Sequence, residues 1–154
     1  MAKLEDERSK DGEGAAVMEE WQLEPGVVSK LYDVFTVAGL RVDAIEPGRA
    51  LCSFTVPPRL TRMHGGALAS LVDLVGSAVF YAGGSPTTGV SLEITISYVN
   101  AARANEEIEI EGTVLGIGEK TGCVVVEVRK KSTGEVIAHG RHTKYLALAI
   151  SSKL

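Results

Sequence analysis

One long helical segment constrains the fold of this chain more than any other feature. Two glycines open the segment, the residues Gly83-Gly84-Ser85-Pro86 follow its end, and apolar side chains recur between them at helical spacing. Its apolar stripe consists of Leu68, Leu71, Val72, Val75 and Val79. This pattern predicts a helix over residues 65–81 that buries one face against other elements.

Segments on both sides of this helix alternate between apolar and polar side chains, as half-buried strands do. Residues 40–45 and 50–56 are expected to form a hairpin around a Pro-Gly turn, and a shorter helix over residues 21–35 precedes them. Four further strands are expected to form a β-meander: residues 88–100, 106–117, 123–130 and 136–148. The pattern predicts an α+β fold in which a curved antiparallel sheet of five to six strands wraps the long helix.

Length and composition favour a single soluble, intracellular domain. The 154 residues with 45% hydrophobic content suffice for one core, over residues 16–150 after a disordered charged tail at residues 1–15. The formal charge of −4, without basic runs, argues against nucleic-acid binding. No secretory signal is visible, and the apolar stretches are expected to be too short to span a membrane.

Cysteine and histidine spacing gives no support for a metal site or a cofactor. Cys52 and Cys123 lack CxxC spacing, so both are expected to be reduced. His139 and His142 are three residues apart on a predicted strand, so their side chains point to opposite faces.

The start of the long helix is a candidate site for a reacting carbonyl group. Gly65 and Gly66 leave backbone N–H groups unshielded at the positive end of the helix dipole, where they can stabilise an oxygen that becomes negative. His64, directly before them, either orients this loop by hydrogen bonding or caps the helix. A base to accompany this site is expected elsewhere on the helix.

Asp73 is the candidate base, although an isolated Asp on a helix is more often a solvated carboxylate. Small residues, among them Gly76 and Ser77, flank it and are expected to leave room for substrate or a partner. Eight residues separate it from Gly65, which corresponds to about 12 Å along a helix. Both groups can act on one carbonyl only if two antiparallel helices meet across a two-fold axis, so we expect a site shared between subunits.

Three motifs in this order resemble the hotdog-fold acyl-CoA thioesterases of the thioesterase-superfamily-member-2 type, in the PaaI-like group. They are MHGGALASLVD at residues 63–73, GVSLEI at residues 89–94 with Tyr98 at the strand end, and GRHTK at residues 140–144. The similarity covers roughly residues 25–148. It implies a homodimer or homotetramer that hydrolyses acyl-CoA to carboxylic acid and CoA in fatty acid metabolism, at sites on the dimer interface.

The resemblance also implies roles for individual residues. Asp73 acts as general base or nucleophile, the Gly65 N–H polarises the thioester carbonyl, and Ser91 places Asp73 or the attacking water. Gly66 is assigned to substrate binding. From their charge, Arg141, His142 and Lys144 either contact the phosphates of CoA or form a solvated strand edge.

One departure from the family pattern keeps other functions open. The family usually carries an Asn six residues before the His, where this chain has Pro58, and losing one oxyanion donor costs about 10²–10³ in rate. A non-catalytic acyl-CoA binding module and a hotdog hydratase or dehydratase are the alternatives. A serine-hydrolase mechanism is disfavoured because Ser70 and Ser77 lack a His–Asp pair in their sequence context.

The residues Ser152-Lys153-Leu154 match the receptor-read signal for peroxisomal import. We therefore expect the peroxisomal import receptor as a partner and the peroxisome as location, with the cytoplasm as the alternative. A random polar tail remains the other interpretation of these three residues.

Overall fold

The structure, a computed structural model, describes residues 27–85 and 87–146. The predicted tail at residues 1–15, the first part of the predicted short helix and the tripeptide at residues 152–154 lie outside these residues. The chain divides into two compact units, residues 1–35 and 36–154, which we describe separately. The helix α2 (Val27–Thr36), which lies in the first unit except for its last residue, begins within the predicted helical segment and ends one residue after it.

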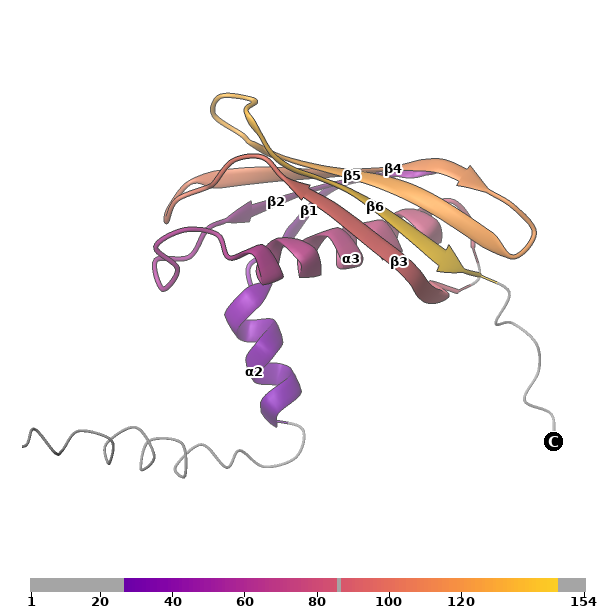
Figure 1. Cartoon of the computed structure of the whole chain (residues 1–154), viewed down its shortest axis with the longest axis horizontal. Helices are drawn as coiled ribbons and strands as arrows, with labels where there is room; N and C mark the ends of the chain where they lie inside the picture. The colour runs from indigo at the N-terminus through magenta and orange to yellow at the C-terminus, as the bar shows by residue number, and fades with distance from the viewer. Residues whose placement is uncertain (1–26, 86, 147–154) are drawn as a thin grey trace, which may run out of the picture. The chain divides into compact units, whose positions relative to one another are not determined.

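Six antiparallel strands form one curved sheet in the second unit, and one long helix lies along its concave side (Figure 1). The order along the chain is β1 (Arg41–Glu46), β2 (Arg49–Thr55), α3 (Gly65–Ala82), β3 (Val90–Tyr98), β4 (Glu107–Ile117), β5 (Thr121–Lys130) and β6 (Val136–Tyr145). The order across the sheet is β1-β2-β4-β5-β6-β3. The predicted α+β fold, with the helix under the sheet, is confirmed.

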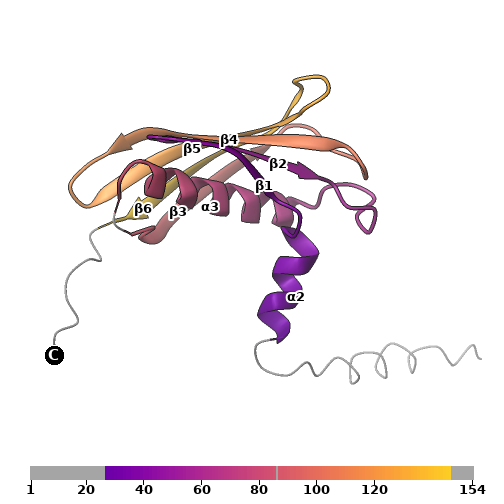
Figure 2. The ribbon, with the colours of Figure 1, turned by 180° about the vertical axis from the view of Figure 1, so that it is seen from behind.

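The position of β3 corrects the expected meander. Of the four strands expected in the meander, β4, β5 and β6 follow one another as neighbours, whereas β3 pairs with β6 at the far edge of the sheet, from Val90 opposite Tyr145 to Tyr98 opposite Ala138. The reason is that α3 runs beneath the sheet, as Figures 1 and 2 show, so the chain that leaves β2 re-enters the sheet next to β6. Local alternation predicts strands but does not choose their partners.

The predicted apolar stripe of α3 is the centre of the core. All five of its members are at most 4% exposed: Leu68, Leu71, Val72, Val75 and Val79. Burying each contributes roughly 1.5–3 kcal/mol. Glycine on the inner face of the sheet permits this packing, because a Cβ atom at Gly112 would lie 2.6 Å from Val79 Cγ2.

The expectation that the apolar stretches are too short to span a membrane was wrong for α3. Its 18 residues are long and apolar enough to cross a bilayer by length and composition. Its apolar face, however, packs under the sheet, and the core helix of a soluble protein has the same composition. The burial of this face therefore accounts for the apolar character of α3.

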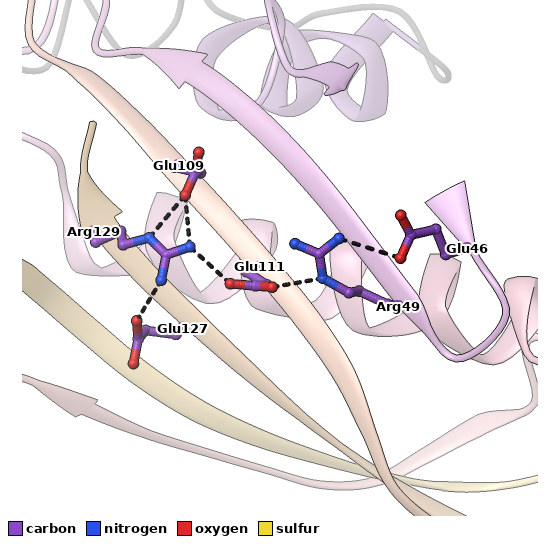
Figure 3. Close-up of polar contacts among 6 residues, drawn as sticks. All are labelled: Glu46, Arg49, Glu109, Glu111, Glu127 and Arg129. Carbon is purple, nitrogen blue, oxygen red and sulfur yellow. Dashed lines mark hydrogen bonds and ion pairs between the residues drawn. The ribbon is translucent and has the colours of Figure 1, made fainter. Parts of the chain in front are cut away.

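Alternating charges cover the opposite face of the sheet across β2, β4 and β5 (Figure 3). Glu111 lies between Arg49, at 2.6 Å, and Arg129, at 2.7 Å. Arg129 also contacts Glu109 and Glu127. These charge-assisted bonds hold the pKa of Glu111 below its usual value, with the Arg49 hydrogen bond the largest cause. The pairs link three neighbouring strands and thereby support their register.

Candidate active site

The first turn of α3 is fixed by one residue before it and one residue of β3. His64 is the N-cap, and its Nδ1 accepts a hydrogen bond from the Gly66 N–H at 3.0 Å. The Tyr98 hydroxyl donates to the Gly65 carbonyl oxygen at 3.1 Å. Of the two roles considered for His64, the structure contains the capping bond. The sequence identified Tyr98 only as part of a motif, without this contact.

The two glycines at this turn serve different purposes. A Cβ atom at Gly66 would lie 3.1 Å from His64 Nδ1, so glycine there leaves space for the cap. The Gly66 N–H is thus engaged within the chain. Gly65 is the first helical residue, and its N–H has no acceptor one turn earlier in the helix. This leaves the Gly65 N–H as the better candidate donor to a substrate oxygen.

Asp73 lies at the middle of α3, with its side chain 47% exposed. Its Oδ1 accepts a long hydrogen bond of 3.4 Å from Ser77 and lies 3.6 Å from His142 Nδ1. The expected open space next to Gly76 is absent, because a Cβ atom at that position would meet His142 Nδ1 at 3.0 Å. The small residue therefore admits His142 of β6 rather than a ligand.

His142 is completely buried between α3 and the sheet. Its Nε2 lies 2.8 Å from the Ser91 hydroxyl on β3, while its Nδ1 has no hydrogen-bond partner among the described residues. Burial lowers the pKa of His142, the Lys144 charge lowers it further, and Asp73 opposes both effects. The imidazole is consequently neutral at neutral pH. A proton on Nδ1 would face the Asp73 carboxylate and leave Nε2 to accept from Ser91.

Lys144 lies two residues after His142 on β6 and contacts the same part of α3. Its side chain is buried, and its Nζ donates to Ser77 Oγ at 2.6 Å. Burial lowers the pKa of Lys144, with the Asp73 carboxylate acting in the opposite direction. Arg141, directly before His142 on β6, is exposed, as is His139. The three predicted CoA contacts are therefore divided between the two faces of β6.

Ser91 and Tyr98 lie on an edge strand whose second side has no partner among the described strands. Large apolar side chains on β3 are exposed, including Val90 at 53% and Leu92 at 59%. Such an edge is a template for pairing with another chain.

A pocket of about 400 Å³ lies next to Gly65, lined by residues 59–65. Backbone bonds from Met63 to Ala102 and from Ala104 to Thr61 tie this loop to the segment after β3. Pro58 lies directly before the pocket, and the pocket wall includes Arg62.

No group of three or more His, Cys, Asp or Glu suited to hold a metal ion is present among residues 27–85 and 87–146. Cys52 and Cys123 are both free.

The thioesterase superfamily model matches residues 60–137, which contain Gly65, Asp73 and Ser91. The human protein acyl-coenzyme A thioesterase 13 is 35% identical over 104 residues, covering 65% of this chain and 74% of its own. The chain belongs to the thioesterase superfamily.

Solved structures of thioesterase-superfamily proteins share its fold. Zebra fish thioesterase superfamily member 2 superposes with a TM-score of 0.68 at 29% identity, covering 80% of this chain and 99% of its own. A hypothetical thioesterase of Streptococcus pneumoniae, crystallised with coenzyme A, has a TM-score of 0.67 at 20% identity, covering 72% and 90% of the two chains. These likenesses confirm the predicted hotdog fold. The inward residues of β6 lie beyond the part that the superfamily model matches.

Several site features were not predicted from sequence. From sequence, His142 and Lys144 were expected either to contact the phosphates of CoA or to form a solvated strand edge, and neither was connected to Asp73. A usable signal was present, because the two residues share one face of a strand whose other inward residues are apolar or glycine. Ionisable residues on a buried strand face need partners, and α3 presents Asp73 to His142 and Ser77 to Lys144.

Proposed function

We propose that this chain hydrolyses acyl-CoA thioesters to a carboxylic acid and CoA, with Asp73 as general base. The main observation in support is that the half-exposed Asp73 carboxylate lies against a buried, neutral His142, which also contacts Ser91. Membership of the thioesterase superfamily and the similarity to human acyl-coenzyme A thioesterase 13 support acyl-CoA as the substrate class.

The proposed site is shared between two copies of the chain. Gly65 and Asp73 lie eight residues apart on one continuous helix, about 12 Å, so one protomer cannot present both to the same carbonyl. The exposed apolar edge of β3 supports pairing with β3 of a second copy, and a two-fold axis there would run the two α3 helices antiparallel. A homodimer, or a homotetramer of two such dimers, follows from this arrangement.

In the proposed reaction, Asp73 accepts a proton from water while the water oxygen bonds to the thioester carbonyl carbon. The carbonyl oxygen takes up negative charge next to the Gly65 N–H of the other protomer. The carbon–oxygen double bond then re-forms, the carbon–sulfur bond breaks, and the CoA sulfur leaves with the proton that Asp73 returns. Ser91, donating to His142, keeps its oxygen lone pairs available to orient the water.

A covalent route through Ser91 is the alternative mechanism, because Ser91, His142 and Asp73 follow one another in the order of a Ser–His–Asp triad. Ser91 Oγ would attack the carbonyl carbon and pass its proton to His142, which gives it to the CoA sulfur as the carbon–sulfur bond breaks. Water would then hydrolyse the acyl ester to the carboxylic acid and restore the Ser91 hydroxyl. The 3.6 Å from His142 to Asp73 exceeds a hydrogen bond and favours the water route. Mass spectrometry of quenched turnover distinguishes the two, because only the covalent route adds an acyl group to Ser91.

Pro58 remains the principal argument for reduced activity or for a non-catalytic binding module. A proline supplies no side-chain donor for the oxyanion, so the Gly65 N–H would act with fewer partners. We propose that the adjacent pocket at residues 59–65 receives the substrate next to this N–H. Outside this pocket, Arg141 is the better candidate to bind a phosphate of CoA, because it is exposed whereas His142 and Lys144 are buried. Gly66 would approach the bound acyl-CoA through its bare backbone.

The experiment is thiol release from a panel of aliphatic and aromatic acyl-CoAs by the full chain, with Asp73→Asn as the matched variant. Release that is lost in the variant supports the proposal. No release with measurable acyl-CoA binding favours the binding module, and hydration of an enoyl-CoA favours the hydratase alternative. Release at an equal rate in both proteins would remove Asp73 from the mechanism.

We also propose that Ser152-Lys153-Leu154 directs the protein to peroxisomes through the import receptor. A fluorescent protein fused before residue 1 should accumulate in peroxisomes and lose that location when residues 152–154 are removed. Unchanged location on removal would contradict the assignment.

A further inference from the structure

Lys144 is a charged side chain in an environment that penalises charge. It is only 4% exposed on the inner face of β6, and burial lowers its pKa. A buried ammonium group needs an acceptor and an opposite charge, because desolvation of an unpaired ion is strongly unfavourable. Its recorded acceptor is the neutral hydroxyl of Ser77 at 2.6 Å. The compensating charge must come from beyond that hydroxyl.

The chemistry of the donors sets the direction of the hydrogen bonds through Ser77. An ammonium group can only donate, so the Ser77 oxygen accepts from Lys144. The single Ser77 proton is then directed elsewhere, and the recorded acceptor is Asp73 Oδ1 at 3.4 Å, one helical turn earlier. Lys144, Ser77 and Asp73 therefore form a chain in which every donor points toward the carboxylate.

The other groups that face Asp73 do not replace this cation. His142 from β6 is held neutral by burial, and Ser91 from β3 is uncharged. On β5, the inward neighbours of this region are Val124 and Val126, both fully buried. Lys144 is consequently the positive charge that acts on the carboxylate from the buried side.

We propose, on the basis of the function proposed above, that Lys144 acting through Ser77 is a positioning residue that orients the Asp73 carboxylate as the base. The Ser77 proton is directed at Asp73 because Lys144 donates to the Ser77 oxygen. Removing the lysine leaves the Ser77 hydroxyl free to rotate, and removing the hydroxyl breaks the hydrogen-bonded connection while leaving the lysine in place.

The test compares full-length Lys144→Met, Ser77→Ala and Ser77→Thr, with Lys120→Met as a matched control at an exposed lysine. Lys144→Met and Ser77→Ala should each lower kcat by about tenfold with KM little changed, since a misplaced catalytic group loses up to about 10²-fold, and Ser77→Thr should restore most of the loss. Lys120→Met should retain both constants.

The carbon-13 NMR signal of the Asp73 carboxyl group, recorded at one fixed pH in the same proteins, gives a readout independent of turnover. A displaced signal in Lys144→Met and Ser77→Ala that returns in Ser77→Thr supports the proposal even if thioester hydrolysis is absent from the wild type, an outcome that would instead defeat the proposed function. An unchanged signal in both Lys144→Met and Ser77→Ala would reduce Lys144 to a structural role and overturn the proposal. If Lys144→Met does not fold, the comparison of Ser77→Ala with Ser77→Thr tests the proposal. Equal activity of these two variants would overturn the proposal.

Discussion

The Nε2 atom of His142 lies 2.8 Å from the hydroxyl oxygen of Ser91, which joins the inner face of β6 to the edge strand β3. The other ring nitrogen faces Asp73 on α3. One buried imidazole thus links three elements that are far apart in the sequence. The contact makes His142 part of the site without exposing it to solvent.

Replacement of His142 by Gln is expected to lower kcat by about 10²-fold, because Ser91 loses its orienting partner and misplacement of a catalytic group has effects of this size. Ser91→Ala should add little to the His142→Gln variant, since the two residues act as one unit. Steady-state kinetics of the single and double variants measure this coupling. Exposed His139→Gln is the control, and full additivity of the two losses would contradict the linkage.

The stability of the fold should fall as pH drops below the ordinary histidine pKa of 6.5, because the pKa of His142 is lowered in the folded state. Between that folded pKa and 6.5 the unfolded chain binds a proton that the native protein does not, so stability rises with pH in this window. The loss approaches about 1.4 kcal/mol per pH unit at most. Tm measured at pH 7.5 and 5.5 tests this, and His142→Gln should flatten the difference. An equally steep dependence in the variant would assign it to other groups.

Gly112→Ala is expected to destabilise the protein by about 1–3 kcal/mol, because its new Cβ atom would overlap Val79 in a packed core. Gly116→Ala on the same strand is the matched control, since a Cβ atom there has nothing within 4 Å. Denaturant unfolding gives both free energies. Combining Gly112→Ala with Val79→Ala should cost less than the sum of the two changes, and simple additivity would argue against the overlap.

Glu111→Gln should lower the free energy of unfolding by about 0.5–1 kcal/mol at low salt, because Glu111 contacts two guanidinium groups on a partly exposed face. Its pKa is lowered by these contacts, so the contribution is present at neutral pH and is lost as pH falls below the ordinary value of 4.5. Unfolding curves at two salt concentrations measure the effect. Glu119→Gln, in the turn after β4, should change little, and an equal loss there would assign the effect to net charge.

Leu92→Lys should convert the assembled protein to monomers if β3 is the edge that pairs with a second copy. The substitution places a charge on a strand whose apolar side chains are exposed in the single chain. Analytical ultracentrifugation measures the mass, and activity should fall in parallel because the proposed site needs two protomers. Val42→Lys on the other edge strand, β1, is a control of equal exposure, 58% against 59% for Leu92. Dissociation by Val42→Lys alone would place the interface at the opposite edge.

The sequence by itself determined the elements of this protein and the main candidates within them. The apolar period of residues 65–81 predicted α3 and its buried stripe, and alternation predicted each strand to within a few residues of its observed bounds. These features are local, because helix and strand periodicities depend on neighbours along the chain. Asp73 and Gly65 could be identified as candidates for the same reason, because a lone carboxylate and a glycine at the helix start are both features of one helical segment.

The tertiary structure alone decided which distant residues meet. The position of β3 at the far edge depends on α3 running under the whole sheet, and this position brings Ser91 to His142. Which residues of α3 His142 and Lys144 meet depends on the register of β6 over Gly76 and Ser77, which no local pattern specifies. Pairing and packing between distant segments are set by the burial of the whole core, so the surroundings of Asp73 became visible only in the folded chain.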